Sequence, residues 1–277
     1  MNPTTRADRA ADFLARHSQA EAFVLPNVWD AGSAKVMQDA GFTALATTSA
    51  GIAFAAGLPD DGGIGRDAML ERIAAITAAV TVPVSADIEA GYADAADGVA
   101  TTIRGVIAAG AVGANLEDAD PARRGSLYDI ADAAERVAAA RRAADAEGIA
   151  FTLNARIDSF LIGHPDPFAD AVERAARYVA AGADCIFVPG ISGEAEIARV
   201  VDAIDAPLNV VAGLVGEPLD LATYSGLGVR RISIGGSLAR ASLGLVRRAA
   251  NDLLAGRFDF TDGAMSHTEL NDLMGRS

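Results

Sequence analysis

A single pattern repeats along most of this 277-residue chain: a short apolar run, followed by a longer segment with the periodicity of an amphipathic helix. Short uninterrupted apolar runs are typical of strands that are buried on both faces of a sheet. Eight such runs alternating with eight helical segments predict an α/β fold, the (β/α)₈ or TIM barrel. The expected strands are 22–25, 43–48, 82–87, 112–116, 150–155, 184–188, 207–211 and 229–234, and the expected helices lie near 31–40, 66–80, 94–110, 129–147, 166–182, 193–204, 217–226 and 236–256.

Glycines mark the ends of several predicted helices. A helix commonly ends on a glycine because this residue adopts the left-handed backbone conformation without a steric penalty. Four glycines stand between a helical segment and the next apolar run, and they support the expected helix-to-strand turns. They are Gly41, Gly110, Gly182 and Gly228.

The pattern continues without a linker, a low-complexity tract or a run of like charges. We therefore expect one barrel domain over 1–277, with a core at about 22–256. A tail over 257–277 would end in a short helix. Hydrophobic residues make up 51% of the chain, which is enough for a large core.

Charge and cysteine content limit the partners. The formal net charge of −14 would repel nucleic acid and anionic membranes, so neither is expected as a partner. An anionic ligand would need a local positive site. The single cysteine, Cys185, allows no internal disulfide. With a polar N-terminus and no apolar run of about 18 residues, we expect a cytoplasmic location.

Carboxylates follow two neighbouring predicted strands, at the end of the barrel where such folds place their chemistry. Asp87 and Glu89 are two residues apart and should project to the same side of an extended segment, with Glu117 at the matching level of the next strand. Three carboxylates without a nearby His or Cys favour a hard cation, so we predict a Mg²⁺ site with Mn²⁺ as an alternative ion. Asp118 is out of phase and either supports this site from behind or caps a helix.

Other strand ends carry groups suited to binding an acid. Arg156 offers a planar fork to a carboxylate or phosphonate, or balances the acidic rim, and Asp158 is placed to orient it. Asn209 offers an amide.

Small residues and a loop acid complete the candidate site. Thr48, Ser49 and Ala50 provide hydroxyls and accessible N–H groups for a carboxylate, or simply form a tight turn. Asp60, in the glycine-rich loop GLPDDGG, is a candidate acid or base or a turn former.

Several alternatives are disfavoured. The three histidines, His17, His164 and His267, lie away from the predicted strand ends, which argues against a zinc hydrolase. The only lysine, Lys35, is on the first predicted helix, which argues against a Schiff-base aldolase. Cys185 begins a strand and is expected in the core. The stretch GVRRISIGGS is either a phosphate-binding turn or an ordinary β-to-α turn.

These motifs together resemble the isocitrate lyase and phosphoenolpyruvate mutase superfamily over roughly 22–245. The stretches that carry the resemblance are NVWDAGSAKVMQDAGFTALATTSAGIAFAAGLPD, PVSADIEAGY, GANLED and NARID. The resemblance implies a (β/α)₈ barrel whose last helix packs on a neighbouring subunit, in a dimer or tetramer. It also implies a 2-oxo or 2-hydroxy acid bound to a Mg²⁺ ion.

The resemblance assigns roles to individual residues. Mg²⁺ would be held by Asp87, Glu89 and Glu117, partly through water, and the loop aspartate would be Asp60. The substrate carboxylate would be held by Thr48, Ser49, Ala50, Arg156 and Asn209.

The loop 119–128 departs from the family pattern. It reads ADPARRGSLY and lacks the Cys, Lys and His of the lyases that split isocitrate or methylisocitrate, and also the Lys or Asn of the mutase and hydrolase. Arg123 or Arg124 would be poor substitutes, because arginine does not readily act as an acid or base. Pro189 stands where the methylisocitrate lyases have a Glu.

The reaction that survives these departures is C–C cleavage beside the carbonyl of a small 2-oxo (or 2-hydroxy) dicarboxylate, through a metal-stabilised enolate. Oxaloacetate-type decarboxylation fits best, since CO₂ leaves without a base. Two alternatives remain: a C–P enzyme of the phosphonopyruvate mutase or hydrolase type, and a barrel that binds a 2-oxo acid without turning it over.

Overall fold

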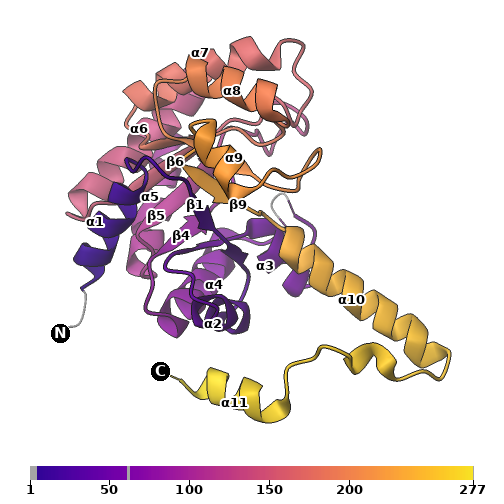
Figure 1. The fold of residues 1–277 in the computed structure, drawn as a ribbon. Coiled ribbons are helices and arrows are strands. Elements are labelled where there is room, and N and C mark those ends of the chain that lie inside the picture. The colour runs from indigo at the N-terminus through magenta and orange to yellow at the C-terminus, as the bar shows by residue number, and fades with distance from the viewer. Residues whose placement is uncertain (1–4, 61–62, 277) are drawn as a thin grey trace.

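The computed structural model, which describes residues 5–60 and 63–276, confirms the predicted barrel (Figure 1). Each pairing between strands is parallel, in the order β1-β9-β8-β7-β6-β5-β4-β3-β2, and the sheet is nearly closed. The strands are β1 (Phe23–Leu25), β2 (Asn27–Val28), β3 (Leu45–Thr47), β4 (Val84–Asp87), β5 (Gly113–Glu117), β6 (Thr152–Arg156), β7 (Cys185–Phe187), β8 (Leu208–Val211) and β9 (Arg231–Ser233).

Helices connect consecutive strands and cover the outside of the sheet. The glycines predicted to end helices have φ between 91° and 103°, which confirms that interpretation. The helices are α1 (Arg6–Arg16), α2 (Ala31–Asp39), α3 (Ser49–Ala55), α4 (Arg66–Ala79), α5 (Ala96–Ala108), α6 (Ile130–Ala146), α7 (Pro167–Ala180), α8 (Glu194–Ala203), α9 (Leu221–Gly226), α10 (Ser237–Leu254) and α11 (His267–Gly275), with a 3₁₀ turn η1 (Asp259–Thr261).

The first predicted strand, 22–25, matches β1, and Pro26 separates it from the additional short strand β2, which explains why nine strands form an eight-fold barrel. Proline has no N–H to donate to a neighbouring strand. Its carbonyl still accepts a hydrogen bond from the Ala46 N–H at 2.9 Å. Before Pro26 the chain pairs with β9, and after it with β3, so this one segment joins the two ends of the sheet.

Helix α1 precedes the predicted core and lies against the amino-terminal ends of the strands. Its start is held by a capping box in which Thr5 and Asp8 bond to each other's backbone N–H. Phe13 is fully buried, in a cluster that includes Leu25 and Val112 at strand ends. This helix was not among those predicted, although its residues are amphipathic: Ala10 and Phe13 are buried three residues apart and the rest of the helix is partly or fully exposed.

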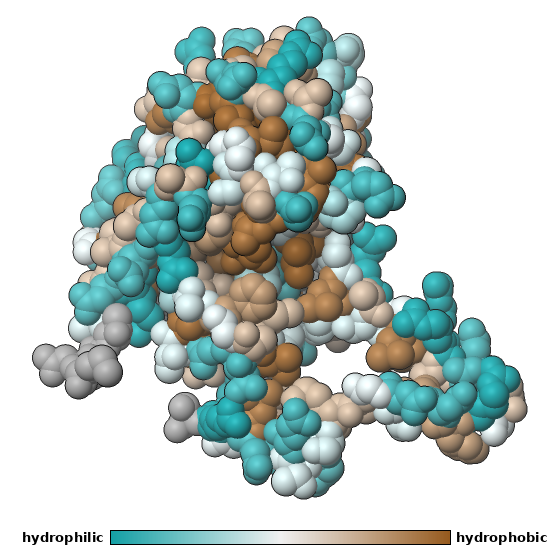
Figure 2. All heavy atoms as spheres, viewed as in Figure 1, coloured by the Kyte–Doolittle hydropathy of each residue, from teal (hydrophilic) through white to brown (hydrophobic). Residues whose placement is uncertain are grey.

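Helix α10 projects away from the barrel and exposes apolar side chains along its length (Figures 1 and 2). Val246 is 62% exposed and Leu254 is 88% exposed. The chain then returns, and α11 packs on α2 through buried Leu273 and through Lys35, whose ammonium donates to the Met274 carbonyl at 2.7 Å. Within the described residues, no helix is long and apolar enough to cross a bilayer.

Candidate active site

A cavity of about 300 Å³ lies at the carboxyl ends of the strands. Strand ends from distant parts of the sequence meet there because the sheet curves into a barrel. Seven of the residues predicted from the sequence line this cavity: Thr48, Ser49, Ala50, Asp60, Asp87, Arg156 and Asn209.

Asp87 ends β4 and is held in place by three neighbouring groups. Its Oδ2 accepts the backbone N–H of Ser49 at 2.9 Å, and its Oδ1 accepts the Asn115 amide at 3.1 Å. The Asn115 side-chain oxygen in turn accepts the Asn154 amide at 2.9 Å. The Asp87 N–H donates to Thr47 Oγ1 at 2.8 Å. Asp87 is therefore oriented by a chain of amides across β4, β5 and β6.

The predicted extended geometry between Asp87 and Glu89 is wrong. Strand β4 ends at Asp87, and Glu89 has a left-handed φ of 48°. The backbone forms a turn at this point. Tyr92 also has a positive φ, of 51°, and the Gly91 N–H donates to the Ile88 carbonyl at 2.8 Å. Non-glycine residues in this conformation are uncommon and concentrate at functional sites. The turn directs Glu89 to the Tyr92 hydroxyl, which donates to it at 3.0 Å.

Glu117 ends β5 and is buried beside Arg156, its neighbour in the sheet register. Their side chains form an ion pair with 2.7 Å between Nη1 and Oε2. Burial raises the pKa of Glu117 well above its usual value against the attraction of Arg156, and the charges of Asp158, Asp87 and Glu89 raise it further. Neither Glu89 nor Glu117 is among the described residues that line the cavity, so Asp87 alone of the three predicted metal ligands faces it.

Arg156 is oriented as predicted by Asp158. The guanidinium donates to both carboxylate oxygens, at 2.6 Å and 2.8 Å. Burial by itself would lower the pKa of Arg156, but the carboxylates of Asp158 and Glu117 raise it above its usual value. Each of its three nitrogens thus already contacts an acid, and a ligand would meet only its remaining N–H groups.

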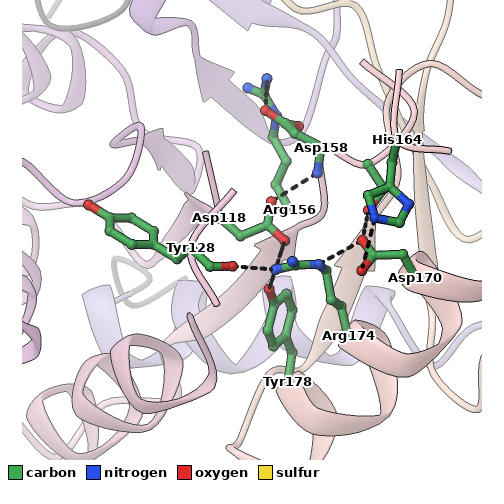
Figure 3. Close-up of polar contacts among 9 residues, drawn as sticks. Asp118, Tyr128, Arg156, Asp158, His164, Asp170, Arg174 and Tyr178 are labelled. Carbon is green, nitrogen blue, oxygen red and sulfur yellow. Dashed lines mark hydrogen bonds and ion pairs between the residues drawn. The ribbon is translucent and has the colours of Figure 1, made fainter. Parts of the chain in front are cut away.

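Asp118 lies behind the site and does not cap a helix, since α6 begins at Ile130 (Figure 3). Its Oδ1 accepts the Asp158 backbone N–H at 2.9 Å, and its Oδ2 accepts the Tyr178 hydroxyl at 2.7 Å and Arg174 at 3.2 Å. Burial raises the pKa of Asp118 to about 6. The network connects α7 to the carboxylate that orients Arg156, so of the two predicted roles Asp118 has the supporting one.

Thr48 and Ser49 form the start of α3, a short helix that the apolar pattern did not indicate. Thr48 is its N-cap and accepts the Gly51 N–H at 3.2 Å. The Ser49 N–H was expected to be free to bind a substrate carboxylate, but it already donates to Asp87. The Ser49 hydroxyl lies 3.5 Å from Asp60, which brings the loop acid to the cavity wall. The next two residues of that loop, 61 and 62, lie outside the described part of the chain.

Sequence reasoning missed several polar residues of the cavity wall, among them Asn27, Asn115 and Arg231. Asn27 follows the proline that separates β1 from β2, donates to the Thr47 carbonyl at 2.7 Å and accepts the N–H groups of Ile234 and Gly235, each at 2.9 Å. It thereby secures the turn before α10. Asn115 and Arg231 lie inside motifs that were recognised, GANLED and GVRRISIGGS, but nothing in those motifs shows that their side chains face the cavity.

Loop 119–128 forms its own turn, and none of its residues lines the cavity. Asp120 accepts from Arg123 Nε at 2.7 Å and from the Ala122 N–H at 2.9 Å. Ala119 and Leu127 form an isolated antiparallel bridge. This arrangement accounts for one of the two loop arginines without any role in the cavity.

Comparison with known proteins decides the family. Residues 13–254 match the phosphoenolpyruvate phosphomutase family. The chain belongs to the isocitrate lyase/phosphoenolpyruvate mutase superfamily. The resemblance seen in the sequence is thereby confirmed, over almost the whole barrel and the start of the C-terminal region.

Three relatives in this superfamily show its chemical range. A 2,3-dimethylmalate lyase of Eubacterium barkeri is 33% identical over 265 residues, covering 91% of this chain and 89% of its own. A Burkholderia cenocepacia protein named only as a lyase/mutase is 46% identical, with a TM-score of 0.92 and coverage of 98% and 97%. A phosphonopyruvate hydrolase, solved with oxalate and Mg²⁺, is 25% identical, with a TM-score of 0.84 and coverage of 96% and 95%.

The superfamily's lyases and mutases support an enzyme with C–C lyase activity. The named lyase relative acts on 2,3-dimethylmalate, a small acid. Members of the superfamily differ in the bond they break. At these identities, family membership therefore leaves the specific reaction to be argued from the cavity.

Proposed function

We propose that this protein is a Mg²⁺-dependent lyase that cleaves a C–C bond beside the carbonyl of a small 2-oxo dicarboxylate, as an oxaloacetate decarboxylase does. One observation carries the proposal: Asp87 and Arg156 share a cavity that no residue of loop 119–128 enters. A reaction that needs only charge stabilisation suits such a site. Reactions that need an acid or base from that loop do not.

The carboxylates fit a hydrated ion better than a directly caged one. Among residues 5–60 and 63–276, no three His, Cys, Asp or Glu side chains converge as a ready metal site. Burial is the main reason that the pKa of Glu117 is raised, and the negative charges of Asp158, Asp87 and Glu89 nearby raise it further. Mg²⁺ usually keeps several waters and binds through one or two carboxylates. Asp87 would hold it directly, with Glu89 and Glu117 acting through water, and Mn²⁺ would fit the same oxygen ligands.

When bound, Mg²⁺ would polarise the 2-oxo group and offset the negative charge that develops on it. The chain's own residues supply the rest. Ser49 N–H and Asn115 hold Asp87 in its orientation. The remaining N–H groups of Arg156 would stabilise the enolate that departing CO₂ leaves behind, and such preorganised donors are usually a large part of catalysis.

One substrate carboxylate would be bound at the start of α3, and Asn209 offers a further donor for the acid groups of the substrate. Thr48, Ser49 and Ala50 all line the cavity, and the Asn209 amide nitrogen has no partner among the described residues. Asp60, beside the Ser49 hydroxyl, would transfer to the enolate the proton that quenches it. Decarboxylation then needs no further base.

The test is an assay of oxaloacetate and phosphonopyruvate, each with Mg²⁺ and with EDTA. We expect pyruvate and CO₂ from oxaloacetate only when Mg²⁺ is present. Arg156→Gln should lower kcat by roughly 10²–10³-fold. Arg123→Gln is the matched control, because this guanidinium is paired with Asp120 outside the cavity, and it should leave kcat unchanged. Turnover of phosphonopyruvate alone, or tight oxalate binding without any turnover, would refute the proposed reaction.

We also propose a homo-oligomer, dimer or tetramer, with α10 at the contact. Exposing this many apolar side chains of α10 to water is unfavourable, and packing them against another subunit would bury them. They are Leu243, Leu245, Val246, Leu253 and Leu254.

A further inference from the structure

Arg231 is a buried cation without a hydrogen-bond partner. It begins β9, is 2% exposed and lines the cavity. In the described part of the chain, its Nε and Nη1 are fully buried and donate to nothing. Its guanidinium carbon lies 6.0 Å from the centre of the Phe13 ring, at the outer limit for a cation–π contact.

Two other arginines line the cavity, Arg156 and the exposed Arg240. The situation of Arg156 differs from that of Arg231. Arg156 donates to both oxygens of Asp158 and pairs with Glu117. Arg231 is influenced by the charge of Asp87, but the two side chains form no ion pair. Of the arginines that line the cavity, Arg156 is therefore neutralised, whereas Arg231 is buried and lacks a counter-charge within contact distance among the described residues.

An unpaired buried charge is costly, so a protein usually keeps one only where something binds to it. Burial lowers the pKa of Arg231 to about 10, which leaves the group protonated at neutral pH. Arg231 is therefore a buried positive charge inside a protein whose net charge is strongly negative.

A second donor lies beside it on the next strand. Asn209 is paired with Arg231 in the sheet register and is 1% exposed. Its side-chain oxygen accepts the Ser233 hydroxyl at 3.3 Å, which leaves the amide nitrogen as the end without a partner. Two unsatisfied donors on adjacent strands, both lining one cavity, form a site complementary to an oxyanion.

We propose that Arg231, together with Asn209, binds a second anionic group of the substrate and makes the enzyme selective for dianionic 2-oxo acids over monoanionic ones. This inference rests on the proposed function and assigns the deep end of the same cavity. The first carboxylate and the 2-oxo group would lie near Asp87. The second group, a carboxylate or a phosphonate, would reach Arg231.

The test compares probes with and without the additional group. Oxalate has only two adjacent carboxylates, whereas 3,3-difluorooxaloacetate carries a distal carboxylate and phosphonopyruvate a phosphonate. Calorimetry with Mg²⁺ would measure each against the wild type, Arg231→Met and Arg231→Lys. We expect Arg231→Met to bind oxalate within about 3-fold of the wild type but to lose at least about 10-fold affinity for the matching longer probe, with partial recovery in Arg231→Lys.

Thermal unfolding separates this role from a structural one. Arg231→Met should keep or raise the Tm, because it removes an unpaired buried charge. Arg136→Met is the control: that buried guanidinium donates to the Ala90 and Ala93 carbonyls at 2.7 Å and 2.6 Å, so its loss should lower the Tm. The proposal would be overturned if Arg231→Met lost as much affinity for oxalate as for both longer probes, or if it lost no affinity for either longer probe.

Failure of the proposed function gives a different result. If the wild type does not bind oxalate with Mg²⁺, the metal-dependent lyase is refuted. The Arg231 site is then judged by the longer probes without metal. Thermal stabilisation of the wild type by these probes, but not of Arg231→Met, would support the Arg231 site. Equal stabilisation of both proteins would refute it.

Discussion

Acidification should weaken the attachment of α1 to the barrel through one residue, His17. This ring is buried between Phe13 and Phe23, with centroid distances of 5.2 Å and 5.1 Å. Its Nδ1 lies 3.0 Å from the Phe13 carbonyl, and its Nε2 is buried without a partner among the described residues. Burial, followed by the charge of Arg231, lowers the pKa of His17 to about 3.

The sign and size of the effect follow from linkage. A histidine with a lowered pKa in the folded state stabilises that state fully above its unfolded value of 6.5, and this contribution is lost as the pH falls from 6.5 towards about 3. At pH 5 the unfolded chain binds this proton and the folded chain does not. From about pH 7 to about pH 5 the loss is therefore about 2 kcal/mol.

The assay is urea unfolding of the wild type and His17→Phe at both pH values. Phenylalanine keeps the ring contacts and cannot take up a proton. The difference in unfolding free energy between the two proteins should change by about 2 kcal/mol across this range. Using the difference matters because buried Glu117 and Asp118 have raised pKa values and act with the opposite sign.

A wild-type to His17→Phe difference that stays constant within about 0.5 kcal/mol would refute the reasoning, because it would mean that the folded protein protonates His17 as easily as the unfolded chain does.

Three further outcomes are expected. Asp87→Asn should abolish Mg²⁺ binding in calorimetry, because Asp87 is the predicted ligand that faces the cavity, whereas Asp118→Asn should retain it; equal loss would contradict the assignment. Val246→Glu, on the exposed side of α10, should lower the mass measured by light scattering, and an unchanged mass would exclude that residue from the subunit contact. Gly113→Ala should lower the free energy of unfolding, measured with urea, by about 1–3 kcal/mol, because the added Cβ would lie 2.8 Å from a carbonyl oxygen of the neighbouring strand. Gly65→Ala, which has open space around it, serves as the neutral control.

The barrel itself was predictable from local patterns. Apolar runs bounded by glycines place the strands within a few residues of their positions, because buried strands must be apolar and helix ends need left-handed residues. Helix α1 was not predicted, although Ala10 and Phe13 stand three residues apart on one buried face. The tertiary structure decides what this face packs on, because Phe13 meets strand ends that are distant in sequence.

The candidate site was predictable where it depends on position along a strand. Asp87 and Arg156 end their strands and Thr48 directly follows β3, so closure of the barrel is sufficient to bring them to one cavity. Asn209 joins them from within β8. Glu89 shows the limit of this reasoning. Its spacing from Asp87 indicates a shared side, but its left-handed backbone turns it towards Tyr92.

The sequence by itself determined which residue types stand at the strand ends, and hence the fold, the family and an acidic rim suited to a cation. Only the tertiary structure decided which charges are already paired. Arg156 and Arg231 both belong to barrel strands, yet in the described part of the chain Arg156 meets Asp158 and Glu117 while Arg231 meets no acid. The Asp158 contact is local and was predicted from the sequence. Glu117 comes from the neighbouring strand, and whether an acid reaches Arg231 depends on the side chains that the closed barrel brings around it.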